Sequence, residues 1–369
     1  MTEETIGRPR PLIAALPAYR PGKGAKQAEQ EHGITNAIKL ASNENPDEPL
    51  DPIVAAVATA AHGINRYPDH RATAVREAIA ARLDVGVDQV SIGTGSSGLL
   101  QQFVWAYVDP DDEVLYPWRS FEAYPIFTNL AGGKSVTVPL ADDLTYDADG
   151  LVGAFTARTK LLMLATPNNP TGVATSTRDL AAIVERIPSD VIVVIDEAYR
   201  EFVDPAYGDP VSELVPRFPN VVVTRTFSNA HGLAGLRLGY VIGDPRVIAT
   251  IDKTLLPFAV NSLAQVAALA AIEHDGEIAM RVQGILAERG RVEDELSRSG
   301  WKLPDHQGNF VWLRTGDATD AVGLALERRG VVVRPFAGDG VRVTIGTPAE
   351  NDRFLSALAE VVAEGTVEV

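Results

Sequence analysis

The chain has 369 residues, of which 46% are hydrophobic and 22% are charged, and it contains no cysteine. A hydrophobic fraction near one half is typical of a globular protein, and the length suits two or three domains of about 150 residues each. The net charge of −16 argues against a surface built for nucleic acid or anionic lipid, and the missing cysteines exclude disulfides, thiolate nucleophiles and cysteine metal sites.

The first twenty residues carry acids where a secretory signal would carry bases, and prolines interrupt their apolar run. No uncharged stretch approaches the roughly 20 apolar residues that a membrane-spanning helix needs. We therefore expect a cytoplasmic protein with neither nucleic acid nor membrane as a partner. Residues 1–40 are predicted to form an arm that ends in a short strand at the sequence IKLAS and to belong partly to a small domain.

From about residue 50 the chain alternates helical and strand patterns. Helical composition predicts helices at 51–61, 72–83, 97–107 and 177–187. Compact β-branched runs predict strands near 91 and at 113–117, 135–140, 160–167, 190–199 and 220–228. These runs lack alternation, so we expect strands buried on both faces, as parallel strands are. The pattern predicts an α/β fold with a large domain over 41–260, in which helices flank a mostly parallel sheet.

The last third of the chain has a different order of elements. A long helical segment at about 263–297 precedes the patterns NFVWLR, DAVGLALERR, VVVRP, VRVTIG and NDRFLSALAEVV, which read β, α, β, β, α. We expect residues 261–369 to form a linking helix and a smaller α+β domain. The chain shows no repeat of 20–50 residues and no low-complexity linker.

Small and polar residues follow several of the predicted strands. In the run SIGTGSSGLL, Ser96 and Ser97 stand where a strand gives way to a helix. Backbone N–H groups at a helix N-terminus, together with such hydroxyls, suit a phosphate, although a tight turn with a helix cap explains the residues equally well. The run ATPNNPTG at 165–172 suits either a plain turn or an amide fixed at the edge of a crevice.

A carboxylate ends one of the predicted core strands. Asp196 follows the apolar run 191–195, and a charge in such a place is costly unless it is paired or hydrogen-bonded. A protonated ring nitrogen is one partner that would justify it. Further along, the segment 224–240 (TRTFSNAHGLAGLRLGY) gathers glycines, hydroxyls and Arg237 after another strand.

These motifs together resemble a known family. The order SSG, PNNPTG, DEAY and T-x-S-x-x-x-G-L-A-G-L-R-x-G-Y is similar to that of class I/II aminotransferases of fold type I, which use pyridoxal 5'-phosphate. LASNENP near residue 43, NRYPD at 65–69 and VRVTIG resemble the histidinol-phosphate aminotransferase subgroup. Within it, WRSFEAYP at 118–125 and the segment 331–351 most resemble aromatic amino acid (phenylalanine) aminotransferases. The similarity runs in order over nearly the whole chain.

The resemblance implies a cofactor site. The residues that would hold the cofactor phosphate are Ser96, Ser97, Thr226, Ser228 and Arg237. Phe121 would stack on the pyridine ring, and Asn169 and Tyr199 would hydrogen-bond its phenolic oxygen. Asp196 would pair with the ring nitrogen and keep it protonated, so that the ring acts as an electron sink.

The resemblance also implies a homodimer and a substrate side. Tyr67 would reach the cofactor phosphate of the neighbouring subunit. Arg342 would bind the substrate carboxylate through two parallel hydrogen bonds, a geometry that the planar guanidinium suits. Arg334, Tyr19 and Asn43 are expected to line the substrate side.

The chain departs from the family pattern at Asn229, where the family places the lysine that forms the Schiff base. An amide neither forms a Schiff base nor moves a proton between the substrate Cα and the cofactor C4′. A replacement made to trap an adduct, a natural non-catalytic descendant, a misreported modified residue and a substituting lysine all remain open. Of the chain's seven lysines, Lys253 is the only remaining one in the neighbouring sequence. We expect pyridoxal phosphate, pyridoxamine phosphate or an external aldimine to bind without a covalent link to the protein.

The resemblance implies transfer of an amino group from an aromatic amino acid to a 2-oxo acid, with Asn229 making this chain inactive or very slow. Histidinol-phosphate transamination is an alternative, because Arg334 and Arg342 also suit a phosphate. Decarboxylation of a phosphorylated amino acid and cofactor binding without transaminase activity are further alternatives. His231 is interpreted as a packing or surface histidine, and no spacing of His, Asp and Glu predicts a metal site.

Overall fold

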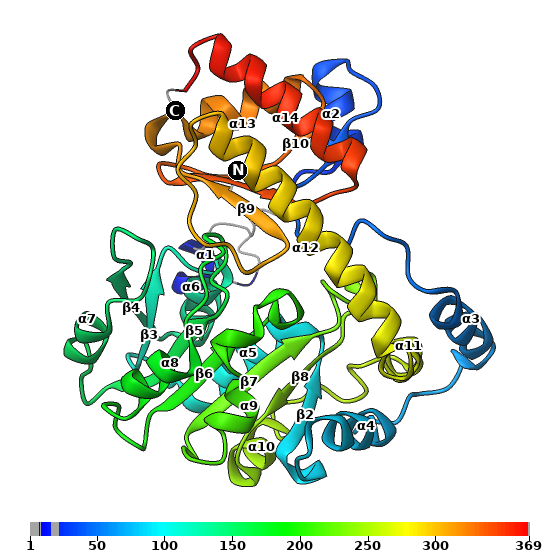
Figure 1. Cartoon of the computed structure of the whole chain (residues 1–369). Coiled ribbons are helices and arrows are strands. Elements are labelled where there is room, and N and C mark those ends of the chain that lie inside the picture. The colour runs from blue at the N-terminus through cyan, green and yellow to red at the C-terminus, as the bar shows by residue number, and fades with distance from the viewer. Residues whose placement is uncertain (1–6, 8, 16–21, 368–369) are drawn as a thin grey trace, which may run out of the picture.

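The computed structural model describes residues 7, 9–15 and 22–367 and shows a larger α/β part below a smaller part (Figure 1). The described helices are α1 (Pro11–Ala15), α2 (Ala25–His32), α3 (Asp51–Ala60), α4 (Thr73–Leu83), α5 (Gly95–Tyr107), α6 (Ala123–Ala131), α7 (Ala148–Gly153), α8 (Thr177–Val184), α9 (Pro210–Glu213), α10 (Pro245–Ile251), α11 (Ser262–Glu273), α12 (Asp275–Arg298), α13 (Thr319–Arg328) and α14 (Pro348–Ala363). Among them, none combines the length and the apolar composition of a membrane-spanning helix.

A seven-stranded sheet in the order β2-β8-β7-β6-β5-β3-β4 forms the centre of the larger part. Its strands are β2 (Val90–Gly93), β3 (Glu113–Trp118), β4 (Lys134–Pro139), β5 (Thr159–Ala165), β6 (Ile192–Asp196), β7 (Val221–Thr226) and β8 (Gly239–Ile242). The strands from β4 to β7 run parallel, and β8 is antiparallel to both β7 and β2. The predicted mostly parallel sheet is confirmed. Strand β8 was not predicted, because its first two residues, Gly239 and Tyr240, end the glycine-rich motif at 224–240.

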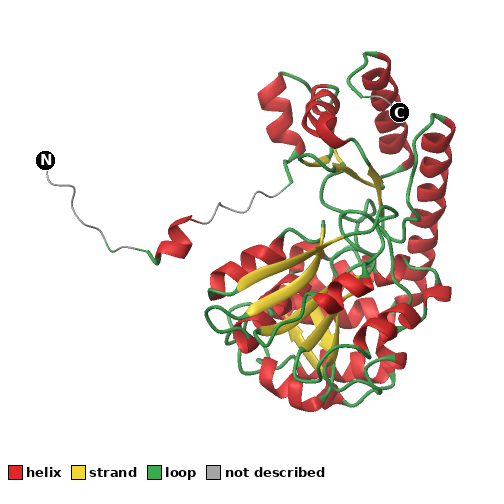
Figure 2. Ribbon diagram, turned by 90° about the vertical axis from the view of Figure 1, so that its left-hand side faces the viewer, coloured by secondary structure: helices red, strands yellow, loops and turns green. Residues whose placement is uncertain are grey.

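Helices cover both faces of this sheet, as the yellow strands between red helices show in Figure 2. Alternate residues of a strand point to opposite faces. Leu161 and Met163 of β5 accordingly join a core cluster with α5 and α10, whereas Leu162 and Leu164 join another with α4, α8 and α11. The prediction of burial on both faces is confirmed for the central strands and wrong for β4, which lies at the sheet edge and is mostly exposed.

The smaller part combines a three-stranded antiparallel sheet with helices. Its strands are β9 (Phe310–Leu313), β11 (Arg334–Phe336) and β12 (Gly340–Thr344), while β1 (Ile38–Lys39) pairs in parallel with β10 (Val331–Val332). The predicted strand VVVRP is therefore two strands in different sheets, divided at Val333. The predicted domain limits at residues 40 and 260 stay predictions.

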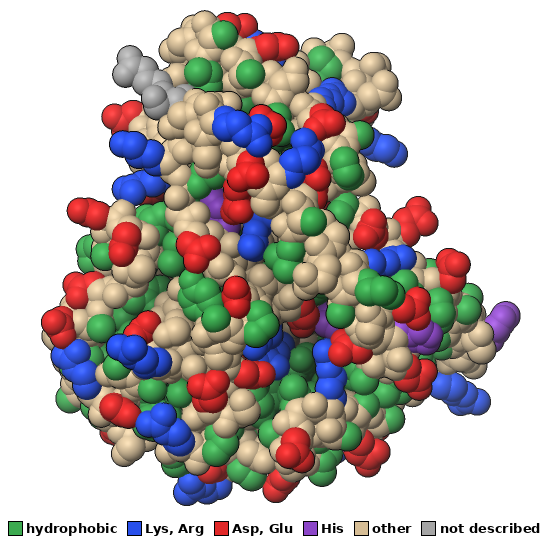
Figure 3. All heavy atoms as spheres, viewed as in Figure 1, with side chains coloured by type: hydrophobic (Ala, Val, Ile, Leu, Met, Phe, Trp, Pro, Cys, Tyr) green, Lys and Arg blue, Asp and Glu red, His purple; other side chains and the backbone are tan. Residues whose placement is uncertain are grey.

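Helix α12 runs between the two parts (Figure 1). The single helical segment predicted at 263–297 is two helices, because the chain turns at His274, where φ is −107° and ψ is 27°. On the face drawn in Figure 3, acidic and basic side chains are interspersed over both parts.

Candidate active site

A cavity of about 330 Å³ lies where strands β5, β6 and β7 end and where the smaller part faces them. The carboxyl ends of parallel strands are the usual place for a ligand in such a sheet. Predicted site residues that line the cavity are Asn43, Ser96, Ser97, Phe121, Asn169, Asp196, Tyr199, Thr226, Ser228, Asn229, Arg237, Arg334 and Arg342. The chain therefore brings together side chains that are up to 299 positions apart in the numbering from Asn43 to Arg342.

One end of the cavity has the composition of a phosphate site. Ser96 and Ser97 lie in the first turn of α5, whose N-terminal N–H groups and dipole attract an anion. Thr226 Oγ1 donates to Ser228 Oγ at 2.9 Å, and Arg237 Nη1 donates to the same hydroxyl at 3.4 Å. Hydroxyls, backbone donors and a guanidinium thus converge, and the residues present fit a phosphate.

Two glycines allow this close approach. A Cβ on Gly95, which has a φ of +76°, would lie 2.7 Å from Arg237 Nη2. A Cβ on Gly239 in β8 would lie 2.4 Å from the backbone nitrogen of Ser96. Any larger residue would therefore push β8 or Arg237 away from the first turn of α5.

Asp196 ends β6 and is 5% exposed. Thr224 Oγ1 donates to its Oδ1 and Tyr124 OH donates to its Oδ2, both at 3.1 Å. In the part of the chain that the structure describes, no lysine, arginine or histidine lies within ion-pairing distance of this carboxylate. Burial raises the pKa of Asp196 to about 6. A protonated ring nitrogen would supply the cation that this buried acid lacks, so the residue fits a pyridine cofactor.

The polar groups around Tyr199 tie the two parts of the molecule together. Asn43 Nδ2 donates to the Tyr199 hydroxyl at 2.9 Å, and the Asn43 backbone nitrogen donates to Thr344 Oγ1 at 2.8 Å. Asn169 Oδ1 accepts a hydrogen bond from Arg342 Nη1 at 2.5 Å. The two residues expected at the phenolic oxygen, Asn169 and Tyr199, therefore both lie in the cavity wall.

The two asparagines of the PNNPTG motif have different positions. Asn168 is buried, accepts from Ser120 Oγ at 2.8 Å and donates to Thr171 Oγ1 at 3.0 Å. These contacts hold the loop in place, while Asn169 lines the cavity. The sequence alone left open whether the motif was a plain turn, and the structure shows that one asparagine fixes the turn while the next one faces the cavity.

Asn229, which the resemblance predicts to occupy the place of the family lysine, lines the cavity. Its Nδ2 donates to the backbone oxygen of Asn43 at 2.7 Å. Among the described residues, no lysine lines this cavity. Lys253, the lysine considered as a substitute, lines a separate cavity beside His70 and Asp252. The structure therefore provides no alternative lysine at the site.

Three residues of the smaller part line the cavity: Arg334, Phe336 and Arg342. Arg342 is 7% exposed and donates to the backbone oxygen of Ala41 at 2.7 Å. Arg334 Nη2 forms an ion pair with Glu122 Oε2 at 2.7 Å. Phe336 and Glu122 were not predicted as site residues. Glu122 directly follows the predicted Phe121, and Phe336 stands two positions after the predicted Arg334.

Tyr67, a predicted site residue, and His231, the histidine interpreted as a packing or surface residue, do not line the cavity. Tyr67 is 82% exposed and stacks on Phe258 with a centroid distance of 4.5 Å. His231 is buried with its ring 4.7 Å from that of Phe227, so it is a packing histidine, and burial lowers its pKa to about 4. Tyr19 lies outside the described residues.

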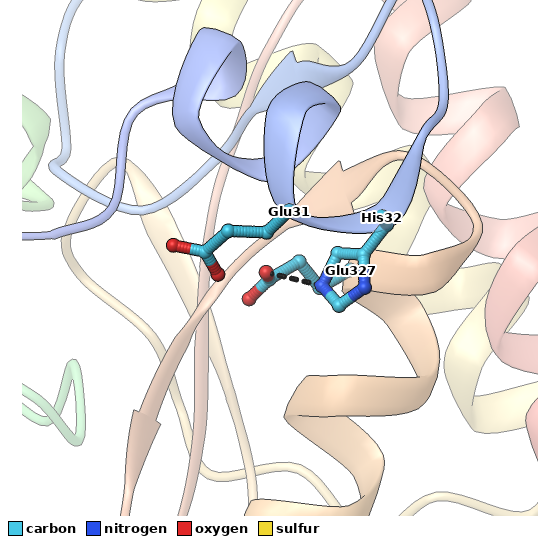
Figure 4. Close-up of side chains that lie close together, drawn as sticks. All are labelled: Glu31, His32 and Glu327. Atoms are coloured by element: carbon cyan, nitrogen blue, oxygen red, sulfur yellow. Dashed lines mark hydrogen bonds and ion pairs between the residues drawn. The ribbon is translucent and has the colours of Figure 1, made fainter.

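One cluster away from the cavity has the residue types of a metal site. Glu31 and His32 of α2 meet Glu327 of α13, and His32 Nε2 lies 2.7 Å from Glu327 Oε1 (Figure 4). The ammonium of Lys23 binds Glu327 at 2.5 Å and also binds Glu31. A lysine thus already supplies the positive charge here, and the cluster fastens α2 to α13.

Comparison with known proteins agrees with the geometry of the cavity. Residues 35–358 match the sequence model of the aminotransferase class I and II family. The chain is 45% identical to an aromatic amino acid aminotransferase of Streptomyces coelicolor over 97% of this chain and 98% of that one. A second such enzyme, from Thermobifida fusca, is 46% identical over 94% of this chain and 95% of that one.

Solved structures show the same relationship. A crystal structure of histidinol-phosphate aminotransferase from Sinorhizobium meliloti in complex with pyridoxal-5'-phosphate superposes with a TM-score of 0.90 at 30% identity, covering 98% of this chain and 99% of that one. A Thermus thermophilus aspartate aminotransferase mutant shares the fold with a TM-score of 0.82 at 23% identity, covering 96% of this chain and 100% of that one. The chain belongs to the class I and II aminotransferases, the fold type I enzymes that depend on pyridoxal 5'-phosphate.

Proposed function

We propose that this chain binds pyridoxal 5'-phosphate or pyridoxamine 5'-phosphate without a covalent link, in a site built to transfer the amino group of an aromatic amino acid to a 2-oxo acid. One observation carries this: the cavity gathers Asp196, Arg237 and Arg342 around Asn229, and no described lysine lines it. When bound, the cofactor supplies an electron sink for the charge that develops at the substrate Cα.

The roles of the cavity residues follow from their chemistry. Arg237 and the hydroxyls at the α5 end hold the phosphate, and Asp196 holds a proton on the ring nitrogen through their mutual attraction. Phe121 covers one face of the ring. Asn169 and Tyr199 orient the phenolic oxygen, and Arg342 holds the substrate carboxylate through its planar guanidinium.

Because residue 229 is an asparagine, the site lacks the amine that a lysine would supply. The amide of Asn229 has no basic nitrogen, so it neither takes a proton from the substrate Cα nor displaces a leaving amine. General base catalysis is worth about 10²–10⁴-fold in rate. We therefore expect the chain to bind cofactor and substrate and to turn over very slowly.

An aromatic substrate is favoured by two observations. Phe121 and Phe336 line the cavity, and curated relatives at 43–46% identity are named aromatic amino acid aminotransferases. Histidinol-phosphate transamination is the second candidate, because Arg334 and Arg342 both line the cavity and a neighbouring structure has that activity in its name.

The test places a lysine at position 229. Asn229→Lys and a control, Asn229→Ala, are loaded with pyridoxal phosphate and assayed with phenylalanine or histidinol phosphate and 2-oxoglutarate. We expect Asn229→Lys to transfer the amino group of phenylalanine at least about 100-fold faster than the parent chain or the alanine variant. A faster rate with histidinol phosphate would favour the second candidate. Retained ligand affinity without any gain in rate would instead indicate a binding protein.

We also propose a homodimer in which Tyr67 contributes to the partner's site. Ile64, Tyr67, Leu256 and Phe258 are large apolar residues between 41% and 82% exposed, and the stacked Tyr67 and Phe258 rings join their two segments. A cluster of this kind on a protein surface is characteristic of an interface. Tyr67 does not line its own cavity, which is what a residue serving the neighbouring subunit requires.

A further inference from the structure

One carboxylate on the substrate side of the cavity, that of Glu122, has no role in the function proposed above. Glu122 stands at the start of α6, and Arg334 lies in β11. Their side chains meet at 2.7 Å, and both residues line the cavity. The two side chains are 33% and 16% exposed, so the pair is partly shielded from solvent and its charges still act on a ligand.

The two cavity arginines that come from the smaller part, Arg334 and Arg342, make different contacts. Arg342 donates to neutral oxygens, Asn169 Oδ1 and the backbone oxygen of Ala41. Arg334 instead has a carboxylate against its guanidinium. An anionic ligand group at Arg334 would therefore lie near the negative charge of Glu122.

An aromatic ring lies between these charges. The guanidinium carbon of Arg334 is 5.6 Å from the centroid of Phe336, and that of Arg342 is 5.7 Å from it. On the same ring, Arg119 lies 5.7 Å away and is itself paired with Asp339, its Nε donating at 2.8 Å. Phe336 thus presents an apolar surface to the cavity, and Arg119 and Arg334 near it are each paired with a carboxylate.

We propose that Glu122 determines substrate specificity by rejecting amino donors that carry a phosphate on the side chain. Its carboxylate balances the charge of Arg334 and repels a dianion, while an uncharged ring on the substrate meets Phe336 without such repulsion. This inference rests on the proposed aminotransferase function and selects between its two substrate candidates.

The test removes one negative charge at a time. Glu122→Gln keeps the length of the side chain and an oxygen that accepts from Arg334. Asp339→Asn is the matched control, because it makes the same change in the Arg119 pair and Asp339 lines a different cavity. Dissociation constants of phenylalanine and histidinol phosphate are measured on protein loaded with pyridoxal phosphate, from the change in cofactor absorbance. Glu122→Ser repeats the charge removal with a shorter side chain.

We expect the parent chain to bind phenylalanine more tightly than histidinol phosphate. Glu122→Gln and Glu122→Ser should strengthen histidinol phosphate binding by about tenfold or more, while phenylalanine changes by less than about twofold. Asp339→Asn should change both by less than about twofold. An unchanged ratio in the Glu122 variants, an equal shift in Asp339→Asn, or tighter histidinol phosphate binding by the parent chain would overturn the proposal.

The same substitutions in the Asn229→Lys background separate the two claims. An active Asn229→Lys protein whose substrate ratio does not respond to Glu122→Gln contradicts only the role of Glu122. An inactive Asn229→Lys protein whose binding ratio does respond contradicts only the proposed transaminase function.

Discussion

Asp196 and His231 are both buried, and burial shifts their pKa values in opposite directions. The pKa of the acid rises to about 6 and that of the imidazole falls to about 4, because desolvation disfavours the charged form of each. In the cofactor-free protein, their contributions to the unfolding free energy therefore change in opposite directions as the pH rises from about 4 to about 6.5. Single substitutions separate the two contributions.

For Asp196, the folded state holds the proton more tightly than the unfolded chain, whose pKa is about 3.9. Its stabilising contribution is fully present below about pH 4 and is lost as the pH rises through about 6. Relative to the parent, the unfolding free energy of Asp196→Asn should therefore rise by up to about 3 kcal/mol from pH 4 to pH 7. Urea titrations of the cofactor-free proteins measure this, and a difference that does not vary with pH would contradict it.

For His231, the folded state favours the neutral ring, whose two nitrogens have no hydrogen-bond partner among the described residues. The stability it confers is present above about pH 6.5 and is lost as the pH falls toward 4. Relative to the parent, His231→Phe should therefore gain up to about 3 kcal/mol of unfolding free energy on going from pH 7 to pH 4. A difference from the parent that does not vary with pH, or one that rises with pH as for Asp196→Asn, would show that the imidazole is not held neutral.

At the scale of elements, the phosphate end depends on the contact between β8 and α5. Gly239→Ala places a methyl group 2.4 Å from the Ser96 nitrogen, against backbone that cannot rotate away. We expect this variant to lose about 1–3 kcal/mol of unfolding free energy and to bind pyridoxal phosphate at least about tenfold more weakly. The matched control is Gly235→Ala, where an added Cβ meets nothing within 4 Å, and it should change stability by less than about 0.5 kcal/mol. Calorimetric titration with the cofactor and urea unfolding give both values, and equal effects in the two variants would contradict the contact.

The strands that sequence predicts best are those with β-branched runs in the middle of the sheet, such as β6 and β7. Strand β8 was not predicted because its single glycine, Gly239, allows the close approach to α5 and weakens the strand pattern. The break between β10 and β11 was missed because VVVRP is uniformly strand-like, and only tertiary pairing divides it between two sheets.

In the candidate site, too, local motifs could be predicted from the sequence and tertiary contacts could not. Residues at strand ends were predicted because motifs mark them, and the cavity contains Asp196, Thr226 and Asn169. Pairs formed across the chain carry no local signal: Glu122 and Arg334 are 212 positions apart, and Tyr124 reaches Asp196 across 72. Sequence therefore predicts which residues line the cavity better than it predicts which residues form hydrogen bonds and ion pairs with them.

At the scale of the whole molecule, the proposed dimer depends on the apolar cluster of Ile64, Tyr67, Leu256 and Phe258. Leu256→Asp places a charge in this cluster, where the parent residue is 60% exposed. We expect a dimer for the parent chain and a monomer for this variant by sedimentation, because a buried unpaired charge at an interface is costly. The control is Met280→Asp on α12, which is 68% exposed and should remain dimeric. Identical behaviour of the two variants would contradict this interface.

With Asn229 in its cavity, this chain is proposed to have an aminotransferase site that lacks only the covalent anchor for the cofactor. The most direct measurement is borohydride reduction of the protein loaded with pyridoxal phosphate, followed by mass spectrometry of the intact chain and its peptides. We predict no cofactor mass on the parent chain and one cofactor mass on Asn229→Lys, in the peptide that contains residue 229. A reduced cofactor attached to any lysine of the parent chain would contradict the account.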